Sequence, residues 1–160
     1  MNSKQQRAIE ELMANHGICT LATIRPDGYP QATIVAFAND ALTLYIGCGK
    51  RAQKLDNIHE CARVSVSIGH DYQDWNQIRG LSLGGVAEEV RDQQELTHAF
   101  NLLLHKFPQV SSFGSPSDVM ADMAIIRVSP EVISLLDYRK GFGHSELFQV
   151  TDKQAGHRHV

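Results

Sequence analysis

The first residues of the chain carry a helical pattern. Ser3 and Gln6 have the spacing of a capping box, and Ile9, Leu12 and Met13 then recur at the spacing of one helix face. Gly17 follows as a stop signal. The pattern predicts a first helix from Ser3 to about Asn15.

Strand patterns come next. Residues 19–24 and 31–37 are rich in Thr, Ile, Val and Phe, and the segment 25–30 between them holds two prolines, an aspartate and a glycine. After the turn signal Asn39-Asp40, apolar and other residues alternate through Leu42 to Gly47. We expect three consecutive antiparallel strands.

The remainder continues with mainly strand patterns. A short helix is expected over 51–60, a strictly alternating strand over 64–68, a long bent strand over 78–90 and a helix that begins at Asp92. The last strands are expected as a pair, 123–128 and 132–136, separated by Pro130. These elements predict a mainly β fold, a six- to seven-stranded antiparallel split β-barrel with short helices, over a single domain at 1–150 with a flexible tail at 151–160.

Composition and charge limit the possible functions. A formal net charge of −3 provides no broad attraction for nucleic acid or anionic membranes. An apolar run of about 18 residues is missing, as is a signal peptide, which favours a cytoplasmic protein without a membrane span. The three cysteines lack metal-ligand spacing, and His157 and His159 in the tail are too isolated to indicate a metal site.

The junction from Gly47 to Leu55 carries the most chemistry. A strand runs through small residues into a helix that begins among Lys50, Arg51 and Lys54. We expect unpaired backbone N–H groups near Gly49 and Lys50, where the helix dipole favours an anion and the three cations supply countercharge. This predicts a phosphate site, with a solvated basic helix start as the alternative.

Several motifs together resemble the pyridoxamine 5'-phosphate oxidase-like FMN-binding split barrel family. They are the hairpin 21–30, the junction 50–58, the strand segment 62–66 and the segment 84–88, and the resemblance covers about residues 5–150. It implies a homodimer that holds FMN between its subunits. It also implies phosphate contacts from Lys50 and Arg51, and less directly from Lys54, at the junction where Gly49 is expected to offer its backbone N–H. Main-chain contacts to the ring are implied along two strands at Ile34, Val35, Ala36, Phe37, Gly47 and Cys48.

Two departures from the true oxidases bear on the substrate. Residues 31–36 contain no basic side chain where those enzymes have them, and Gly80 stands where they have a glutamine. A second phosphorylated molecule would need further cations near the ring. Pyridoxamine phosphate is therefore disfavoured as the substrate, and another small molecule is expected, with NAD(P)H as a candidate reductant.

The segment Asp137 to His144 resembles the Asp-Tyr-x-x-Gly-Phe-Gly-His segment of one subgroup of the family. Phe142 could cover a flavin held by the partner subunit, and His144 could donate a proton to substrate or ligate haem. The alternative is a turn whose Phe142 fills the core and whose His144 is a surface hydrogen-bonder. Trp75 could stack on the cofactor or pack at a loop end.

Two classes of function remain open. The first is an FMN-dependent oxidoreductase that acts on a small molecule by flavin hydride transfer, in which His144 is the candidate catalytic residue. The second is a binding protein that stores or senses flavin without turnover. A third possibility keeps the barrel and exchanges the ligand for a deazaflavin or haem.

Overall fold

The computed structural model describes residues 1–151, so the tail histidines lie outside the described residues. Four helices and seven strands are described, together with three short 3₁₀ segments. The helices are α1 (Ser3–Ala14), α2 (Gln53–Glu60), α3 (Gln93–Lys106) and α4 (Pro116–Asp122). The strands are β1 (Ile18–Ile24), β2 (Pro30–Asp40), β3 (Thr43–Gly49), β4 (Arg63–Ile68), β5 (Arg79–Glu89), β6 (Met123–Asp137) and β7 (Ser145–Gln149).

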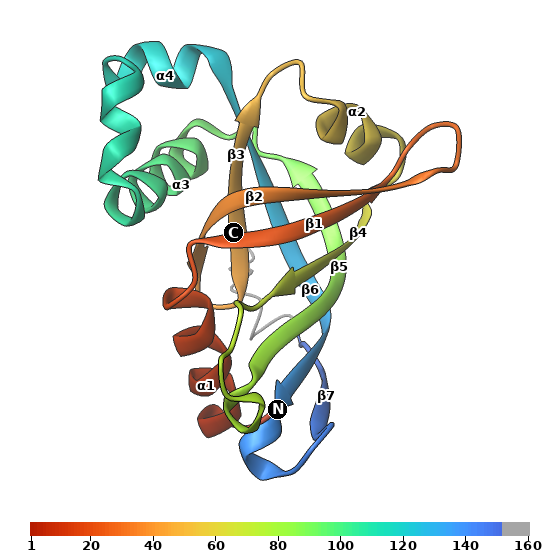
Figure 1. Ribbon diagram of the computed structural model, residues 1–160. Coiled ribbons are helices and arrows are strands. Elements are labelled where there is room, and N and C mark those ends of the chain that lie inside the picture. Colours follow the sequence, from red (N-terminus) through yellow and green to blue (C-terminus); the bar gives the residue numbers. More distant parts are fainter. Residues whose placement is uncertain (152–160) are drawn as a thin grey trace.

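Six of the strands close into a barrel (Figure 1). The order in the sheet is β3-β2-β1-β4-β5-β6-β7, and β3 also pairs with β6. All of these pairings are antiparallel, and β7 extends the sheet beyond β6 as a seventh strand. The predicted split-barrel class and the three consecutive antiparallel strands at its start are confirmed.

The barrel interior is apolar and is closed by helices near its two ends. The alternating strand β4 buries Val64, Val66 and Ile68 and exposes the residues between them, as its pattern predicts. Ile9, Leu12 and Met13 of α1 enter the same core as Leu55 and Ile58 of α2. Figure 1 shows α1 and α2 toward opposite ends of the barrel.

Three expectations about these elements are corrected. The capping box of α1 is formed by Asn2 and Gln5, one residue earlier than expected, because the Asn2 carboxamide accepts from the Gln5 N–H and the Gln5 side chain reaches back. Helix α4 and strand β7 were not expected, because their own segments contain too few apolar residues to show a pattern. The third correction concerns the last predicted strand pair.

The predicted pair at 123–128 and 132–136 is one continuous strand, β6. Pro130 is accommodated because it lies opposite Gly85 at a register shift between Gly84 and Gly85. A bulge of this kind relieves the ladder of a hydrogen bond that proline cannot donate. Gly85 itself leaves room for the backbone of β6, and the strand therefore bends there and continues.

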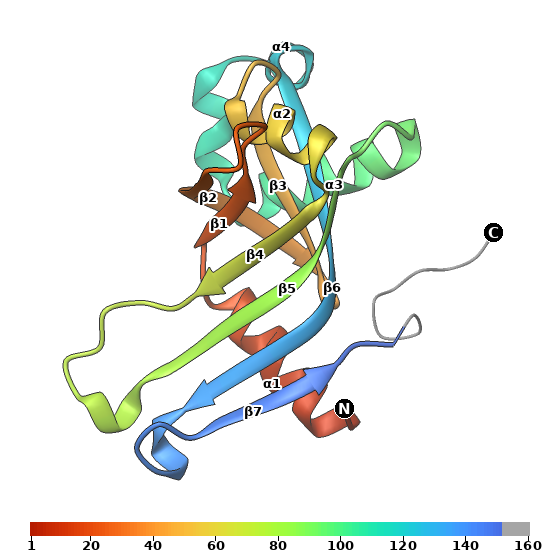
Figure 2. The same ribbon diagram turned by 90° about the vertical axis from the view of Figure 1, so that its right-hand side faces the viewer.

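The outward faces of β4, β5, β6 and β7 lie side by side in Figure 2, with α1 behind them. Among the described residues, no helix has the length and apolar character needed to cross a membrane. No cluster of three or more metal-binding side chains occurs in residues 1–151 either.

Candidate cofactor site

Strands β2 and β3 separate partway along their length. Residues 30–36 of β2 pair with β1, whereas only Phe37–Asp40 pair with β3. Strand β3 pairs with β6 from Leu44 to Gly49, and beyond Ile46 it pairs with β6 alone. A stretch of β2 therefore has one edge without a strand partner, next to the part of β3 that the sequence analysis selected.

The direction of the main chain along this open edge follows from one hydrogen bond. The Phe37 N–H donates to the Gly17 carbonyl on the β1 side, at 3.2 Å. Because successive N–H groups of a strand point to opposite sides, those of Ala36, Ile34 and Ala32 point away from β1. The open edge of β2 thus presents main-chain donors and acceptors at alternate residues.

The four predicted ring residues of β2 divide into two pairs. Val35 and Phe37 are buried in the barrel core, whereas Ile34 is 74% exposed and Ala36 is also on the outer surface. A ligand along this edge would meet the main chain of Ile34 and Ala36 and the Ile34 side chain. Val35 and Phe37 would hold the strand in place from inside the barrel.

The phosphate junction differs in detail from the expectation. The Lys50 N–H is not free, because it donates to the Asp122 carbonyl at 3.2 Å. Helix α2 begins at Gln53, after Ala52, and no side chain caps it. The N–H groups available at this junction therefore lie at the very start of α2, slightly later than Gly49 and Lys50, because the Leu55 N–H already donates to the Ala52 carbonyl at 2.9 Å.

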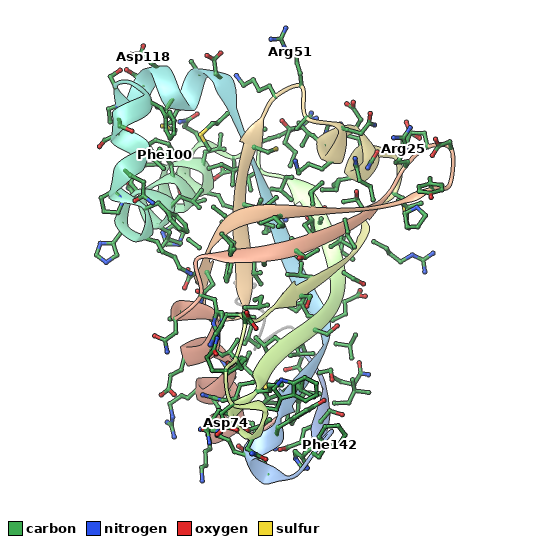
Figure 3. The ribbon with its side chains drawn as sticks, viewed as in Figure 1. Arg25, Arg51, Asp74, Phe100, Asp118 and Phe142 are labelled. Carbon is green, nitrogen blue, oxygen red and sulfur yellow. The ribbon has the colours of Figure 1, made fainter. Side chains whose placement is uncertain are left out.

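The three predicted cations point to different neighbours. The Lys50 ammonium donates to the Ala121 carbonyl at the end of α4, at 2.5 Å. Arg51 is exposed and extends outward from the loop between β3 and α2 (Figure 3). Lys54 is half-buried on the first turn of α2. Arg51 and Lys54 are thus the cations most available to a phosphate at this helix start, and Lys50 fastens α4 to the same loop.

Cys48 lies in this region as a protonated thiol. Burial raises the pKa of the Cys48 thiol, and the nearby Lys54 ammonium lowers it by a smaller amount. A raised pKa reduces the thiolate fraction at neutral pH. The raised pKa supports the interpretation of Cys48 as a small residue that packs beside the site. The effect of the Lys54 ammonium on this pKa shows that Lys54 lies near the same strand.

A hollow of about 850 Å³ lies on the outer face of the barrel. Its lining includes Ile34 of β2 and Gly80 of β5, together with His70, Tyr72 and Trp75 from the segment between β4 and β5. Trp75 is 68% exposed, which excludes core packing for this residue. Of these three residues only Trp75 was predicted as a site residue, although His70 and Tyr72 lie in the same short polar segment.

The neighbours of Trp75 are held by defined contacts. The rings of His70 and Tyr72 stack with their centroids 3.7 Å apart, and the Tyr72 hydroxyl donates to the Arg79 carbonyl at 3.0 Å. His70 Nδ1 lies 3.1 Å from Nε2 of His16, which follows α1. These contacts fix the wall of the hollow against both β5 and the first helix.

The loop from Gly141 to His144 is a tight turn far from the phosphate junction of the same chain. Gly141 and Gly143 have φ of 133° and 74°, conformations that favour glycine. Phe142 is 85% exposed and its ring lies 5.1 Å from that of Tyr138, so it does not fill the core. Figure 3 places Phe142 and Arg51 at opposite ends of the molecule.

His144 has a defined partner in this loop. Its Nε2 lies 3.2 Å from Oε1 of Glu146, a carboxylate that Lys140 also contacts. Lys140 and then His144 lower the pKa of Glu146 by hydrogen bonding. The predicted site residues therefore form two groups within one chain, one at the junction of β3 and α2 and one around Phe142 and Trp75.

The outer face between these groups is uncharged. Cross-strand partners place one row of residues across the sheet, and a second row lies beside it. The first row is Ile34, Thr20, Ser67, Ser82, Ser134 and Leu147, and the second is Ala32, Ala22, Ser65, Gly84, Val132 and Gln149. An extended face of small and apolar side chains is typical of an interaction surface.

Comparisons with solved structures identify the architecture. A conserved hypothetical protein from Mycobacterium tuberculosis has 25% identity and a TM-score of 0.73, with 90% of each chain covered. A member of the pyridoxinephosphate oxidase family from Clostridium acetobutylicum has 15% identity and a TM-score of 0.71, over 96% of this chain and 99% of that one. A haem-binding protein from Mycobacterium smegmatis has 18% identity and a TM-score of 0.75, over 93% of this chain and 59% of that one.

The present chain thus spans less than two thirds of that haem-binding protein. A search of curated protein sequences finds no match. A model of the family described as pyridoxamine 5'-phosphate oxidase matches residues 5–137, most of the chain. The chain therefore belongs to the pyridoxamine 5'-phosphate oxidase family.

Proposed function

We propose that the protein binds FMN in the gap between β2 and β3 and acts as an FMN-dependent oxidoreductase on a small molecule. The observation that carries the proposal is the open edge of β2 at residues 32–36, which ends beside the uncapped, basic start of α2. The edge offers main-chain hydrogen bonds to the polar rim of a planar ring. The helix start offers amides and cations to a phosphate.

Two separate sets of residues fit the two ends of FMN. Arg51 and Lys54 supply charge at the phosphate end, and the carbonyl bound to Lys50 leaves two of that ammonium's three donors free for other acceptors. Ile34 and Ala36 supply main-chain groups at the ring end, with the Ile34 side chain against the ring face. FMN supplies hydride transfer when bound, and the protein supplies orientation and shelter from water.

We further propose a two-fold dimer in which the uncharged outer face is buried. Such a dimer brings Phe142 and His144 of one subunit toward the phosphate end of the other subunit's site, whereas within one chain Phe142 and Arg51 lie at opposite ends of the molecule (Figure 3). Ile34 is exposed on the open edge of β2 and also lines the hollow beside Trp75. The ring end of the proposed site therefore opens onto the face that the dimer would bury. An interface above about 2,000 Å² in total is expected for an obligate pair.

The substrate is a small molecule other than pyridoxamine phosphate in this proposal. Residues 31–36 present no cation, and Gly80 gives the hollow no side-chain amide. The other polar side chains there are mostly hydroxyls, with Asp71 and Arg79 as one charge of each sign, and this lining suits a small polar molecule. His144 is the candidate proton donor, and its contact with Glu146 holds the imidazole in one orientation.

The absorbance spectrum of the purified protein tests the cofactor. We expect flavin bands, and a titration of the apoprotein should give tighter binding of FMN than of riboflavin. The Arg51→Ala variant should weaken FMN binding by roughly ten- to a hundredfold, because a charge-assisted contact contributes about 1.5 to 3 kcal/mol. The matched control is Arg7→Ala, an exposed arginine on α1, which should bind FMN as the unchanged protein does.

Three results would count against the proposal. A haem Soret band without flavin bands would replace the cofactor, and equal affinity for FMN and riboflavin would remove the phosphate end. Flavin that binds tightly but is not reduced by NADH or NADPH, and does not turn over with any acceptor, would leave a storage or sensing protein in place of an oxidoreductase.

A further inference from the structure

A buried polar network ties the start of α2 to the first two strands. Asn57, on the second turn of α2, is 0% exposed. Its Nδ2 donates to Thr23 Oγ1 at 2.8 Å and to Gln31 Oε1 at 3.0 Å. Its Oδ1 accepts from Gln53 Nε2 at 3.0 Å, so the carboxamide uses both donors and its acceptor.

An asparagine at this place is not explained by packing alone. Its helix neighbours Leu55 and Ile58 enter the apolar core, and a leucine at position 57 would fill a similar volume without burying an amide. Buried polar groups are tolerated only when they are hydrogen-bonded, and their bonds are directional whereas apolar contacts are not. The network therefore specifies where α2 sits more narrowly than its apolar contacts do.

The three partners of Asn57 lie on the elements that carry the proposed site. Gln53 is the first residue of α2, between Arg51 and the half-buried Lys54. Gln31 belongs to β2, immediately before Ala32 on the open edge, and Thr23 belongs to β1 beside it. The network thus runs from the phosphate end of the gap to the strand that borders its ring end.

We propose that Asn57 is a positioning residue that sets the distance between the start of α2 and the open edge of β2, and so matches the gap to a ring and a phosphate separated by the ribityl chain. This inference rests on the proposed function. Loss of the network leaves the ring edge intact and lets the helix start shift. The ratio of FMN affinity to riboflavin affinity should therefore fall more than the affinity for riboflavin, which reports binding of the ring.

The test compares Asn57→Leu with Ile58→Val, a core substitution on the same helix that leaves the network intact. In Asn57→Leu the ratio of FMN to riboflavin affinity should fall about tenfold, while riboflavin affinity changes less than threefold. Ile58→Val should lower the thermal midpoint and leave the ratio unchanged. Thr23→Val should reproduce part of the loss, and Thr23→Ser, which keeps the hydroxyl, should restore the ratio.

Hydrogen exchange on the apoprotein gives a second measurement that needs no ligand. The amides of the second turn of α2, which are hydrogen-bonded within the helix, should exchange about tenfold faster in Asn57→Leu than in Ile58→Val when the two are compared at equal global stability. Equal exchange in the two variants overturns the inference, and so does an unchanged affinity ratio in Asn57→Leu. If the unchanged protein itself fails to prefer FMN, the phosphate site is refuted, and the exchange data still decide whether Asn57 holds the helix.

Discussion

Replacing Gly85 by alanine should destabilise the barrel more than its single added methyl group suggests. A Cβ at this position would lie 2.3 Å from the Ser129 carbonyl oxygen, 2.9 Å from the Pro130 Cα and 3.0 Å from the Ser129 carbonyl carbon. An ordinary contact between carbon and a carbonyl oxygen is at least about 3.3 Å. All three neighbouring atoms belong to the backbone of β6, which cannot rotate away as a side chain can.

The clash must be relieved by moving β5 and β6 apart where Pro130 already interrupts their ladder. Overpacking that shifts the backbone costs about 1 to 3 kcal/mol, and we expect the upper end of that range here. For a chain of this length, 3 kcal/mol corresponds to a fall of about 6 to 12 °C in the thermal midpoint. Circular dichroism melts and urea titrations of the apoprotein would measure both quantities.

Two other glycines provide the comparison for Gly85→Ala. A Cβ at Gly84 would lie 3.3 Å from Cγ1 of Val132, a side-chain atom that can adjust, and one at Gly49 would have no atom within 4 Å. The expected order of destabilisation is therefore Gly85, then Gly84, then Gly49 with almost no effect. A Gly85→Ala variant that melts within a degree of the unchanged protein would refute the reasoning.

Four further predictions address the site, the dimer and the titrating groups. Lys50→Met should speed hydrogen exchange in α4, because it removes the bond to the Ala121 carbonyl. It should also weaken FMN binding less than Arg51→Ala does, and a flavin titration in which Lys50→Met has the larger effect would contradict this. Ser67→Arg introduces a charge into the uncharged outer face and should convert the dimer to monomer by light scattering, and a dimer of unchanged mass would exclude this face as the interface. Bidentate bonding by Arg139 lowers the pKa of the buried Asp137 below its ordinary value, so Asp137 stabilises the fold above the unfolded-state pKa near 4 and loses this contribution as pH falls through the lowered value. The urea midpoint of Asp137→Asn should accordingly fall less below pH 4 than that of the unchanged protein, and parallel pH profiles would contradict it. Burial raises the pKa of the Cys19 thiol to about 12, and a disulfide reagent at pH 8 should label Cys19 only after unfolding.

The barrel class could be predicted because period-two patterns reflect local burial. In β4 each apolar residue is inside and each polar residue is outside, and this needs no knowledge of the neighbouring strands. Pro130 misled the prediction because its effect depends on what lies opposite. A proline facing an ordinary residue ends a strand, whereas this one faces Gly85 at a bulge.

The candidate site could be predicted from the sequence only where cations stand at the expected start of a helix. Arg51 and Lys54 stand out as cations at a helix start, which is a local feature of the sequence. The bond from Lys50 to Ala121 was not predictable, since α4 comes near only through the path of β6. Asn57 was missed because a polar helix residue is usually exposed, and its burial depends on where β1 and β2 pass.

Strand β3 pairs with β2, which is near in sequence, and with β6, which is distant, and this orders the events in assembly. Leu44 pairs with Val128, a residue far along the chain, so the barrel closes only after most of the protein has been synthesised and β6 has docked. Contacts between distant residues form late because the intervening loop must first be closed. The part of β3 beyond Ile46, which borders the gap, is held by β6 alone and is placed only once this has happened. On the proposed function, a nascent or truncated chain therefore lacks the complete gap, and a flavin loads onto a finished barrel, where its binding adds to the stability of the closed state.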